Sequence, residues 1–411
     1  MKRLVTIILC LAAVVACDKE YAPEMSGREG GGIYDMSDGG ESVPGDPSGN
    51  GAGQGGGQAG VVTAGEWNDL DNWPFWGDLM TTKSDEQTVG YADVSEYWRF
   101  WTDRRVAVSV KDGSGNPLQG VLVELSSGAD KVWTTQTDVL GRADCWIGLY
   151  DDKYQAGELS ITVNGVQISE PPVVTSWTDE TVAMNEYTIR LYSASAADAP
   201  QPEADILFIV DATGSMTDEI DFLKADLLDI LQKAQQMQTP VKIRTGSLFY
   251  RDEGDDYLTR TSAFTPDFNE TIKFIKQQKA AGGGDFPEAV HTALEVSLQS
   301  FDWNDKARTR IAFMLLDAPP HQDHQGVIES LQKSIELYAS KGIKLIPVAS
   351  SGVDKPTEFC LRLFAIATGG TYVFLTNDSG VGNDHIKATV GEYEVEKLND
   401  LIVRLIQKYI G

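Results

Sequence analysis

Carboxyl and hydroxyl side chains follow the apolar stretches of this 411-residue sequence at a regular spacing. One apolar stretch ends in Asp211, and Thr213 and Ser215 follow at alternate positions. A later apolar stretch also ends in an aspartate, Asp317. Hard divalent cations such as Mg²⁺ take oxygen ligands of these kinds, whereas zinc prefers nitrogen and sulfur. The spacing therefore predicts a site for a hard divalent cation.

A glycine-rich stretch, AAGGGDFPEAV at residues 280–290, offers a third carboxylate at Asp285. Its three glycines let the backbone approach a neighbouring loop closely. Pro287 suits the first turn of a helix, so we expect Asp285 to lie at a helix start. Asp285 either contributes to the cation site or caps that helix, and the sequence leaves both roles open.

The elements that must position these residues alternate between strand and helix from residue 205 onward. Apolar runs predict strands at 205–211, 241–250, 259–265, 310–317, 343–350 and 371–376. Helical spacing predicts helices at 219–235, 268–281, 287–301, 326–342, 356–370 and 394–409. This alternation favours an α/β fold, with a doubly wound, mostly parallel sheet covered on both faces.

Ligands of such sheets bind beyond the carboxyl ends of the strands, where the strand order reverses. If the strands ending in Asp211 and Asp317 are neighbours across that reversal, both carboxylates point into one crevice.

Residues 205–411 resemble a von Willebrand factor type A (vWA) domain, whose fold is Rossmann-like. The metal-ion-dependent adhesion site (MIDAS) of that family has the pattern D-x-S-x-S after the first strand, a threonine in a middle loop and an aspartate after the fourth strand. Asp211, Thr213 and Ser215 match the first element, with threonine replacing one serine, and Asp317 matches the last. The middle loop departs from the pattern, because Gly284 stands where many members have the threonine; Asp285 is then the natural substitute.

The resemblance implies a function in binding rather than in catalysis. The hydroxyls of Thr213 and Ser215 would contact the metal directly, while Asp211 and Asp317 act partly through water. One coordination position would remain for a carboxylate of a partner protein. We expect Mg²⁺ as the ion, with Mn²⁺ or Ca²⁺ as alternatives, and an adhesion or scaffold protein that is not an enzyme.

Two alternatives and a second candidate site stay open. A metal-dependent hydrolase could use the strand-end aspartates, although no lysine or arginine accompanies the motif to stabilise a transition state. A structural module with a degenerate metal site is the other alternative, because the usual threonine is missing. His321 and His324, with Asp323 between them, could bind a transition metal or form a solvated loop.

Residues 104–193 have the two-residue alternation of short strands separated by turns. Six or seven antiparallel strands of this length favour a β-sandwich. The order of valines, glycines and Pro117, followed by TDVLGRA, resembles carboxypeptidase-regulatory-like or Ig-like modules, which are mostly spacers or binding platforms. Small residues and two prolines at 194–204 predict a linker to the second domain.

The first residues fit an export signal. Residues 1–17 have a basic start, an apolar segment and a cysteine, Cys17, in a setting that resembles the lipobox of bacterial lipoproteins. We therefore expect lipidation at Cys17 and anchoring to the outer membrane, on its periplasmic or cell-surface face; an ordinary signal peptide is the alternative. Glycine-rich residues 18–60 predict a flexible tether. The tryptophan-rich residues 61–103 are expected to pack on the following domain.

The net charge of −27 disfavours binding to nucleic acid, because an acidic surface repels phosphate. Divalent cations and basic partners are favoured, and contact with a membrane is expected through the lipid anchor alone. Beyond the signal and Cys17, only Cys145 and Cys360 remain, and either one interdomain disulfide or two buried thiols would account for them.

Overall fold

A computed structural model describes residues 62–85, 88–168, 170–178, 181–192, 200–236, 240–376 and 387–411. The expected signal peptide, Cys17 and the tether lie outside these residues. Within them, no helix has both the length and the apolar character needed to cross a membrane.

The largest element is an eight-stranded sheet in the order β11-β10-β9-β12-β13-β14-β1-β15. Strands β10, β9, β12, β13 and β14 run parallel, and β11, β1 and β15 pair antiparallel at the two edges. The strands span β1 Thr63–Trp67, β9 Gln201–Asp211, β10 Lys242–Tyr250, β11 Thr259–Thr265, β12 Ala307–Leu316, β13 Ile343–Ala349, β14 Tyr372–Leu375 and β15 Glu396–Lys397. The α/β fold with a large, mostly parallel sheet is the one expected from the alternating pattern.

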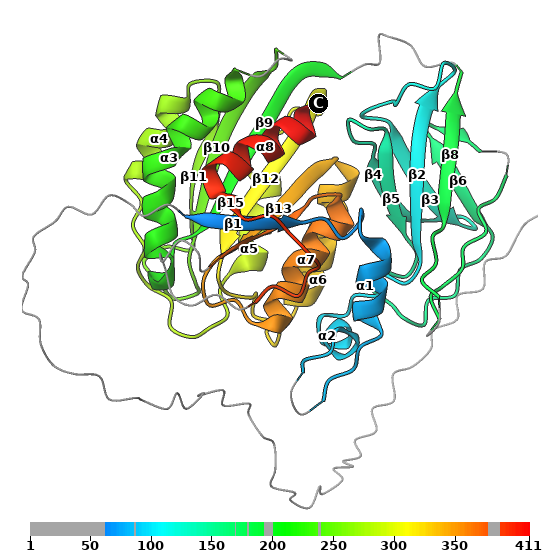
Figure 1. Ribbon diagram of the computed structural model, residues 1–411, viewed down its shortest axis with the longest axis horizontal. Helices are drawn as coiled ribbons and strands as arrows, with labels where there is room; N and C mark the ends of the chain where they lie inside the picture. Colours follow the sequence, from blue (N-terminus) through cyan, green and yellow to red (C-terminus); the bar gives the residue numbers. More distant parts are fainter. Residues whose placement is uncertain are drawn as a thin grey trace, which may run out of the picture. The chain divides into compact units, whose positions relative to one another are not determined.

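Helices cover both faces of this sheet (Figure 1). The residues of β9 alternate between two cores, with Ile206 and Phe208 in one and Leu207 and Ile209 in the other. The first core contains α3 (Thr217–Gln235), α4 (Phe268–Lys276) and α8 (Leu398–Ile410), and the second contains α5 (Val290–Gln299), α6 (Val327–Ser340) and α7 (Lys355–Thr368). Burial on both faces explains why the central strands are apolar throughout.

The strand order reverses between β9 and β12. The chain leaves β9 toward β10 on one side, whereas β12 continues to β13 on the other. The two strands pair in parallel, with Val210 opposite Leu315. Asp211 and Asp317 therefore emerge side by side at the switch point, as the sequence led us to expect.

Two smaller sheets form a β-rich region between β1 and β9. Their orders are β5-β2-β8 and β4-β3-β6-β7. The strands span β2 Arg105–Asp112, β3 Leu122–Ser127, β4 Asp130–Gln136, β5 Arg142–Trp146, β6 Leu159–Val163, β7 Val166–Gln167 and β8 Glu186–Leu191. The expectation of purely antiparallel strands is wrong at one pair, because β2 and β8 run parallel. A long connection between β6 and β8, rather than a hairpin, permits that direction.

The tryptophan-rich segment contacts both regions. Trp73 packs against Trp146 of β5, with ring centroids 5.7 Å apart. Trp76, on α1 (Trp73–Met80), stacks on Phe359 of α7. Trp98 ends α2 (Tyr91–Trp98), and its indole donates a hydrogen bond to the carbonyl of Pro356. The segment therefore joins the β-rich region to the face of the large sheet that α7 covers.

The first described strand belongs to the large sheet, not to the β-rich region. β1 pairs antiparallel with β14, and Ala64 lies opposite Leu375. The chain then forms the β-rich region and returns to the same sheet at β9, which begins at Gln201, inside the expected linker. The β-rich region is thus inserted between two strands of one sheet.

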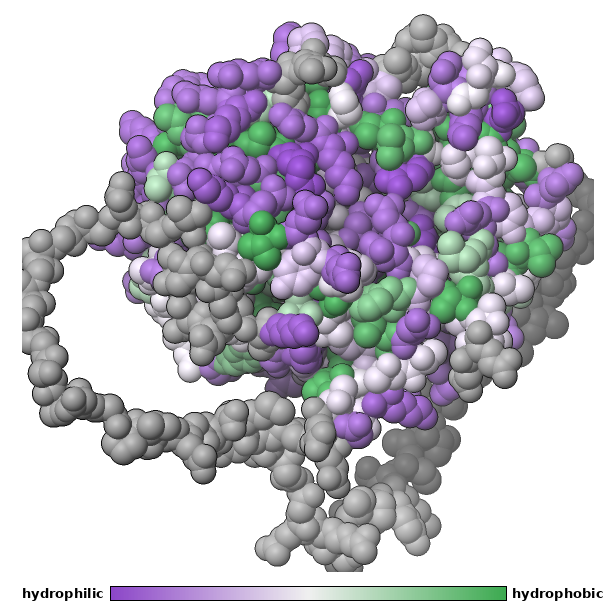
Figure 2. All heavy atoms as spheres, viewed as in Figure 1, coloured by the Kyte–Doolittle hydropathy of each residue, from purple (hydrophilic) through white to green (hydrophobic). Residues whose placement is uncertain are grey.

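The view in Figure 2 shows hydrophilic side chains gathered over α3 and α8, with hydrophobic residues scattered over this face. Cys145 and Cys360 are both buried and both free, so they form no disulfide with each other.

Candidate functional site

The loop after β9 gathers the first three predicted residues. Asp211 is fully buried, and its Oδ1 accepts hydrogen bonds from the backbone N of Thr213 at 2.9 Å and from the Thr213 hydroxyl at 2.7 Å. The hydroxyls of Thr213 and Ser215 lie 3.4 Å apart. A short 3-10 turn at Gly214–Met216 then leads into α3. The three oxygen-bearing side chains thus converge before a helix N-terminus.

Asp317 joins this group from the end of β12. A hydrogen bond from Ser215 lowers its pKa, but burial is the larger effect and raises the pKa above its ordinary value of 3.8. Two carboxylate oxygens, Oδ2 of Asp211 and Oδ1 of Asp317, are buried and have no hydrogen-bond partner. The structure therefore brings together Asp211, Thr213, Ser215 and Asp317.

The glycine-rich loop is fastened to the first loop through backbone hydrogen bonds. Ala281 N donates to Ala212 O at 3.0 Å, and Gly214 N donates to Gly282 O at 3.1 Å. Gly283 has a φ of +76°, and a Cβ there would lie 2.9 Å from Oε1 of Glu288 and 3.3 Å from Cβ of Thr213. Only glycine fits this close approach.

Asp285 lies elsewhere in the loop. It is exposed, and its carboxylate forms a group with Asp252 and His321 in which the ligand atoms all lie within 4.8 Å of one another. Asp211 and Asp317 belong to no group of this kind among the residues that the structure describes. Helix α5 begins at Val290 with Ala289 as its N-cap, so Asp285 does not cap it, and Pro287 precedes it.

Glu288 is the residue that the sequence reasoning missed. Its side chain is buried, and its backbone N donates to Pro319 O at 2.8 Å, which holds it beside the loop that carries Asp317. Its Oε2 is buried without a hydrogen-bond partner. In the sequence, Glu288 stands out only as a second acid in the glycine-rich stretch. The helix expected from residue 287 included Glu288, so it was not considered as a ligand.

Burial and mutual repulsion raise the pKa values of these carboxylates. Burial, followed by the charge of Asp317, raises the pKa of Asp211 to about 7. Burial, followed by the charges of Asp211, Asp252, Asp317 and Asp255, raises the pKa of Glu288 to about 9. Like charges this close cannot all ionise at low cost unless a cation is present.

The chemistry of this donor set fits a hard divalent cation. Asp211, Asp317 and Glu288 each offer an unpartnered, buried carboxylate oxygen, and Thr213 and Ser215 add hydroxyl oxygens. A cation bound among these side chains would reduce the repulsion that raises their pKa values, with some of the carboxylates acting through water.

Gly284, which stands where the related pattern has threonine, leaves room for a side chain. A Cβ at this position would meet no atom within 4 Å, in contrast to Gly283. The loop backbone therefore accommodates the missing threonine, although this chain does not use one.

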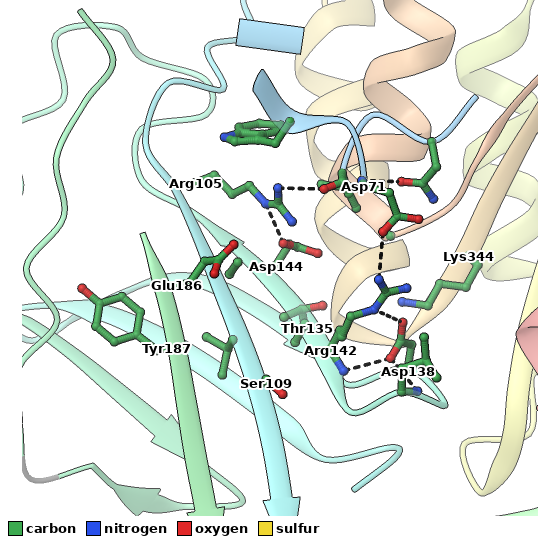
Figure 3. A pocket seen from close by; sticks show the side chains of 18 of the residues that line it. Asp71, Arg105, Ser109, Thr135, Asp138, Arg142, Asp144, Glu186, Tyr187 and Lys344 are labelled. Carbon is green, nitrogen blue, oxygen red and sulfur yellow. Dashed lines mark hydrogen bonds and ion pairs between the residues drawn. The ribbon is translucent and has the colours of Figure 1, made fainter. Parts of the chain in front are cut away.

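A separate cavity of 420 Å³ lies where the β-rich region meets the opposite end of the large sheet (Figure 3). Its arginines are already paired, Arg105 with Asp144 at 2.7 Å and Arg142 with Asp71 at 2.8 Å. Lys344, the second residue of β13, reaches into it from the large sheet. Because ligands of such sheets bind at the carboxyl ends of the strands, the Asp211 group is the stronger candidate site.

The comparisons with known proteins agree with this geometry. Residues 205–358 match the family model described as von Willebrand factor A domain. An ariadne-like RING finger protein of Acanthamoeba polyphaga mimivirus is 35% identical over 203 residues, which cover 46% of this chain and 20% of that protein. An alpha-protein kinase of Dictyostelium discoideum is 30% identical over 118 residues, covering 28% of this chain and 19% of the kinase.

This chain thus spans about a fifth of the length of each of these relatives. The matched residues begin in β9 and extend into α7, so they include both strand-end aspartates and the glycine-rich loop. The chain therefore contains a von Willebrand factor A domain at residues 205–358.

Proposed function

We propose that this protein binds a partner protein through a divalent cation held at the carboxyl ends of β9 and β12. Asp211, Thr213, Ser215 and Asp317 are the ligand-bearing residues, and Glu288 adds a carboxylate beside them. Mg²⁺ is the proposed ion, and a carboxylate of the partner would complete its coordination. The protein would act in adhesion or as a scaffold, without catalysis.

The observation that carries this proposal is the set of three buried carboxylate oxygens without partners on Asp211, Asp317 and Glu288. Buried polar groups are normally hydrogen-bonded, and buried charges are normally paired or bound to metal. These three carboxylates lie near one edge of the sheet, and the buried Tyr250 hydroxyl beside Asp211 is the neutral group that could satisfy one of them; repulsion among the acids supports a cation there.

The two relatives support a binding module. One is named as a RING finger protein and the other as a protein kinase, and in each the similar stretch is a small part of a longer chain. A stretch shared by proteins with such different names fits recognition better than a common reaction.

We further propose that the protein is exported and anchored through a lipid on Cys17 to the outer membrane, on the periplasmic or cell-surface face. The β-rich region would serve as a sandwich-like binding platform. Both proposals rest on the sequence patterns at residues 1–17 and 104–193.

Calorimetric titration of the metal-depleted full chain with Mg²⁺ and Mn²⁺ tests the site. Asp211→Asn should weaken binding at least about tenfold, because it removes one ligand charge while keeping the shape of the side chain. Asp218→Asn, an exposed acid at the start of α3, is the matched control and should bind as the unsubstituted chain does. Unchanged Mg²⁺ binding by Asp211→Asn would reject the site.

Partner binding is tested separately, by capture of cell-surface proteins on the immobilised chain with and without chelator. The proposal expects a protein that is retained in Mg²⁺, released by chelator and absent from the Asp211→Asn column. A protein retained equally by the unsubstituted chain in Mg²⁺, by the same chain in chelator and by Asp211→Asn would show that recognition does not use the cation.

A further inference from the structure

A second group of ligand-type side chains lies at the same edge of the large sheet. Asp252, Asp285 and His321 place one ligand atom each within 4.8 Å of the others. Asp252 follows β10, His321 follows β12, and Asp285 precedes α5. Three loops that are distant in sequence therefore meet in a group that includes Asp285 but neither Asp211 nor Asp317.

Two of these side chains are held firmly. His321 and Asp252 are buried, and Nε2 of His321 lies 2.7 Å from Oδ1 of Asp252. Asp255 fastens the loops that carry the acids, because its Oδ2 accepts from Asp252 N at 3.3 Å and from Gly283 N at 2.9 Å. The exposed carboxylate of Asp285 leaves one side of the group open to solvent.

Further nitrogen and oxygen ligands are within reach on the open side. His321, Asp323 and His324 form a second group whose ligand atoms lie within 4.8 Å of one another. The rings of His321 and His324 stack with their centroids 4.3 Å apart and an angle of 5° between their planes. The two groups share His321, so one ion on that imidazole could recruit ligands from either.

The carboxylate of Glu288 adds negative charge beside this group. Glu288, only 4% exposed, has an unpartnered Oε2 and is repelled by Asp252 as well as by Asp211. Arg251, which precedes Asp252 in the sequence, donates to the carbonyls of Ala212 and Lys279 rather than to these carboxylates. Repulsion between Glu288 and both Asp211 and Asp252 shows that negative charge extends from the first group to the second.

We propose that Asp252, Asp285 and His321 bind a transition-metal ion of the zinc class, in a second site beside the predicted Mg²⁺ site. One imidazole nitrogen with two carboxylates is a donor set for Zn²⁺ and its neighbours rather than for Mg²⁺, which selects oxygen ligands. Asp285 then serves this second site rather than the first.

The test uses the full chain without a histidine tag, depleted of metal and titrated with Zn²⁺, Co²⁺ and Mg²⁺ by calorimetry. Co²⁺ also reports its ligands through visible absorption. His321→Ala and Asp285→Asn should each weaken Zn²⁺ binding at least about tenfold and remove the Co²⁺ absorption band, while Mg²⁺ affinity changes less than about twofold. Asp211→Asn should do the reverse.

His291→Gln is the matched control, because His291 lies on α5 and belongs to neither group. Asp285→Asn keeps the test valid if His321→Ala does not fold, since Asp285 is exposed. Zn²⁺ binding that survives both substitutions would overturn the proposal. So would joint loss of Zn²⁺ and Mg²⁺ binding in Asp285→Asn with an unchanged melting temperature, which would indicate a single shared site.

Discussion

At the scale of single residues, the buried carboxyls of Asp211 and Glu288 weaken the metal-free fold. The pKa of Asp211 is raised from 3.8 to about 7, and the pKa of Glu288 is raised from 4.5 to about 9. An acid whose pKa is raised on folding destabilises the folded state as the pH rises above the unfolded value. A cation bound as proposed would offset this loss of stability.

Asp211 should make the metal-free protein less stable as the pH rises. Between about pH 4 and about pH 7 the folded chain binds more protons at this carboxyl than the unfolded chain does, so unfolding becomes easier. The melting temperature of the unsubstituted chain, relative to that of Asp211→Asn, should fall between about pH 4 and about pH 7 and level off above that range. Added Mg²⁺ should reverse the fall in the unsubstituted chain alone. A difference that is constant with pH would contradict the raised pKa.

Gly283 and Gly284 should respond oppositely to substitution. Gly284→Thr places a hydroxyl where the related pattern has one, and a Cβ there meets no other atom. The melting temperature should therefore stay unchanged. Mg²⁺ affinity should rise by about threefold or more. Gly283→Ala strains a positive φ and pushes against Glu288, and it should cost more than about 1 kcal/mol. Calorimetry and thermal melts check both. Equal tolerance of the two substitutions would count against the loop geometry.

At the scale of elements, helix α7 is fixed by the tryptophan-rich segment through a buried ion pair. Arg362 is fully buried and donates to both oxygens of Asp69, at 3.0 and 2.6 Å. Its guanidinium also lies 5.0 Å from the ring centroid of Trp76. Such a pair adds little net stability over apolar packing, but the loss of Asp69 leaves the buried guanidinium with Glu358, 3.7 Å away, as its remaining ion-pair partner and with two donors unsatisfied.

Asp69→Asn should therefore destabilise the protein by about 3 kcal/mol, measured by chemical denaturation. Glu329→Gln is the control, because its ion pair with Arg99 joins the same segment to α6 but is exposed, and it should cost less than about 1 kcal/mol. Similar losses in the two variants would show that the segment is not held by the buried pair.

At the scale of the whole molecule, the vWA domain is completed by residues outside its family match. β1 supplies a neighbour to β14, and the segment after it covers α7. A sheet edge that loses its partner strand exposes unpaired backbone groups, which promotes aggregation.

A fragment of residues 200–411 should consequently melt at a lower temperature than residues 62–411 and should aggregate more readily. Light scattering and thermal melts on the two fragments make the comparison. A short fragment as stable as the long one would mean that β1 and the tryptophan-rich segment are accessory to the fold.

The sequence predicted the central strands well because burial on both faces makes them apolar throughout. It predicted that Asp211 and Asp317 would be adjacent on the condition that their strands are neighbours, and the pairing of β9 with β12 meets that condition. It missed the exchange of Asp285 for Glu288 at the first site, because α5 begins at Val290 and not at residue 287. It missed β1 because Thr63–Trp67 has no strand pattern of its own, and its pairing depends on a partner some 300 residues away.

The insertion of the β-rich region between β1 and β9 also determines how the molecule would bear tension. A force applied through the residues before Val62 would act first on β1. The hydrogen bonds of β1 to β14 and β15 would transmit it to the large sheet. The β-rich region stands beside that path instead of along it. A force between the proposed lipid anchor and a bound partner would therefore not extend the β-rich region.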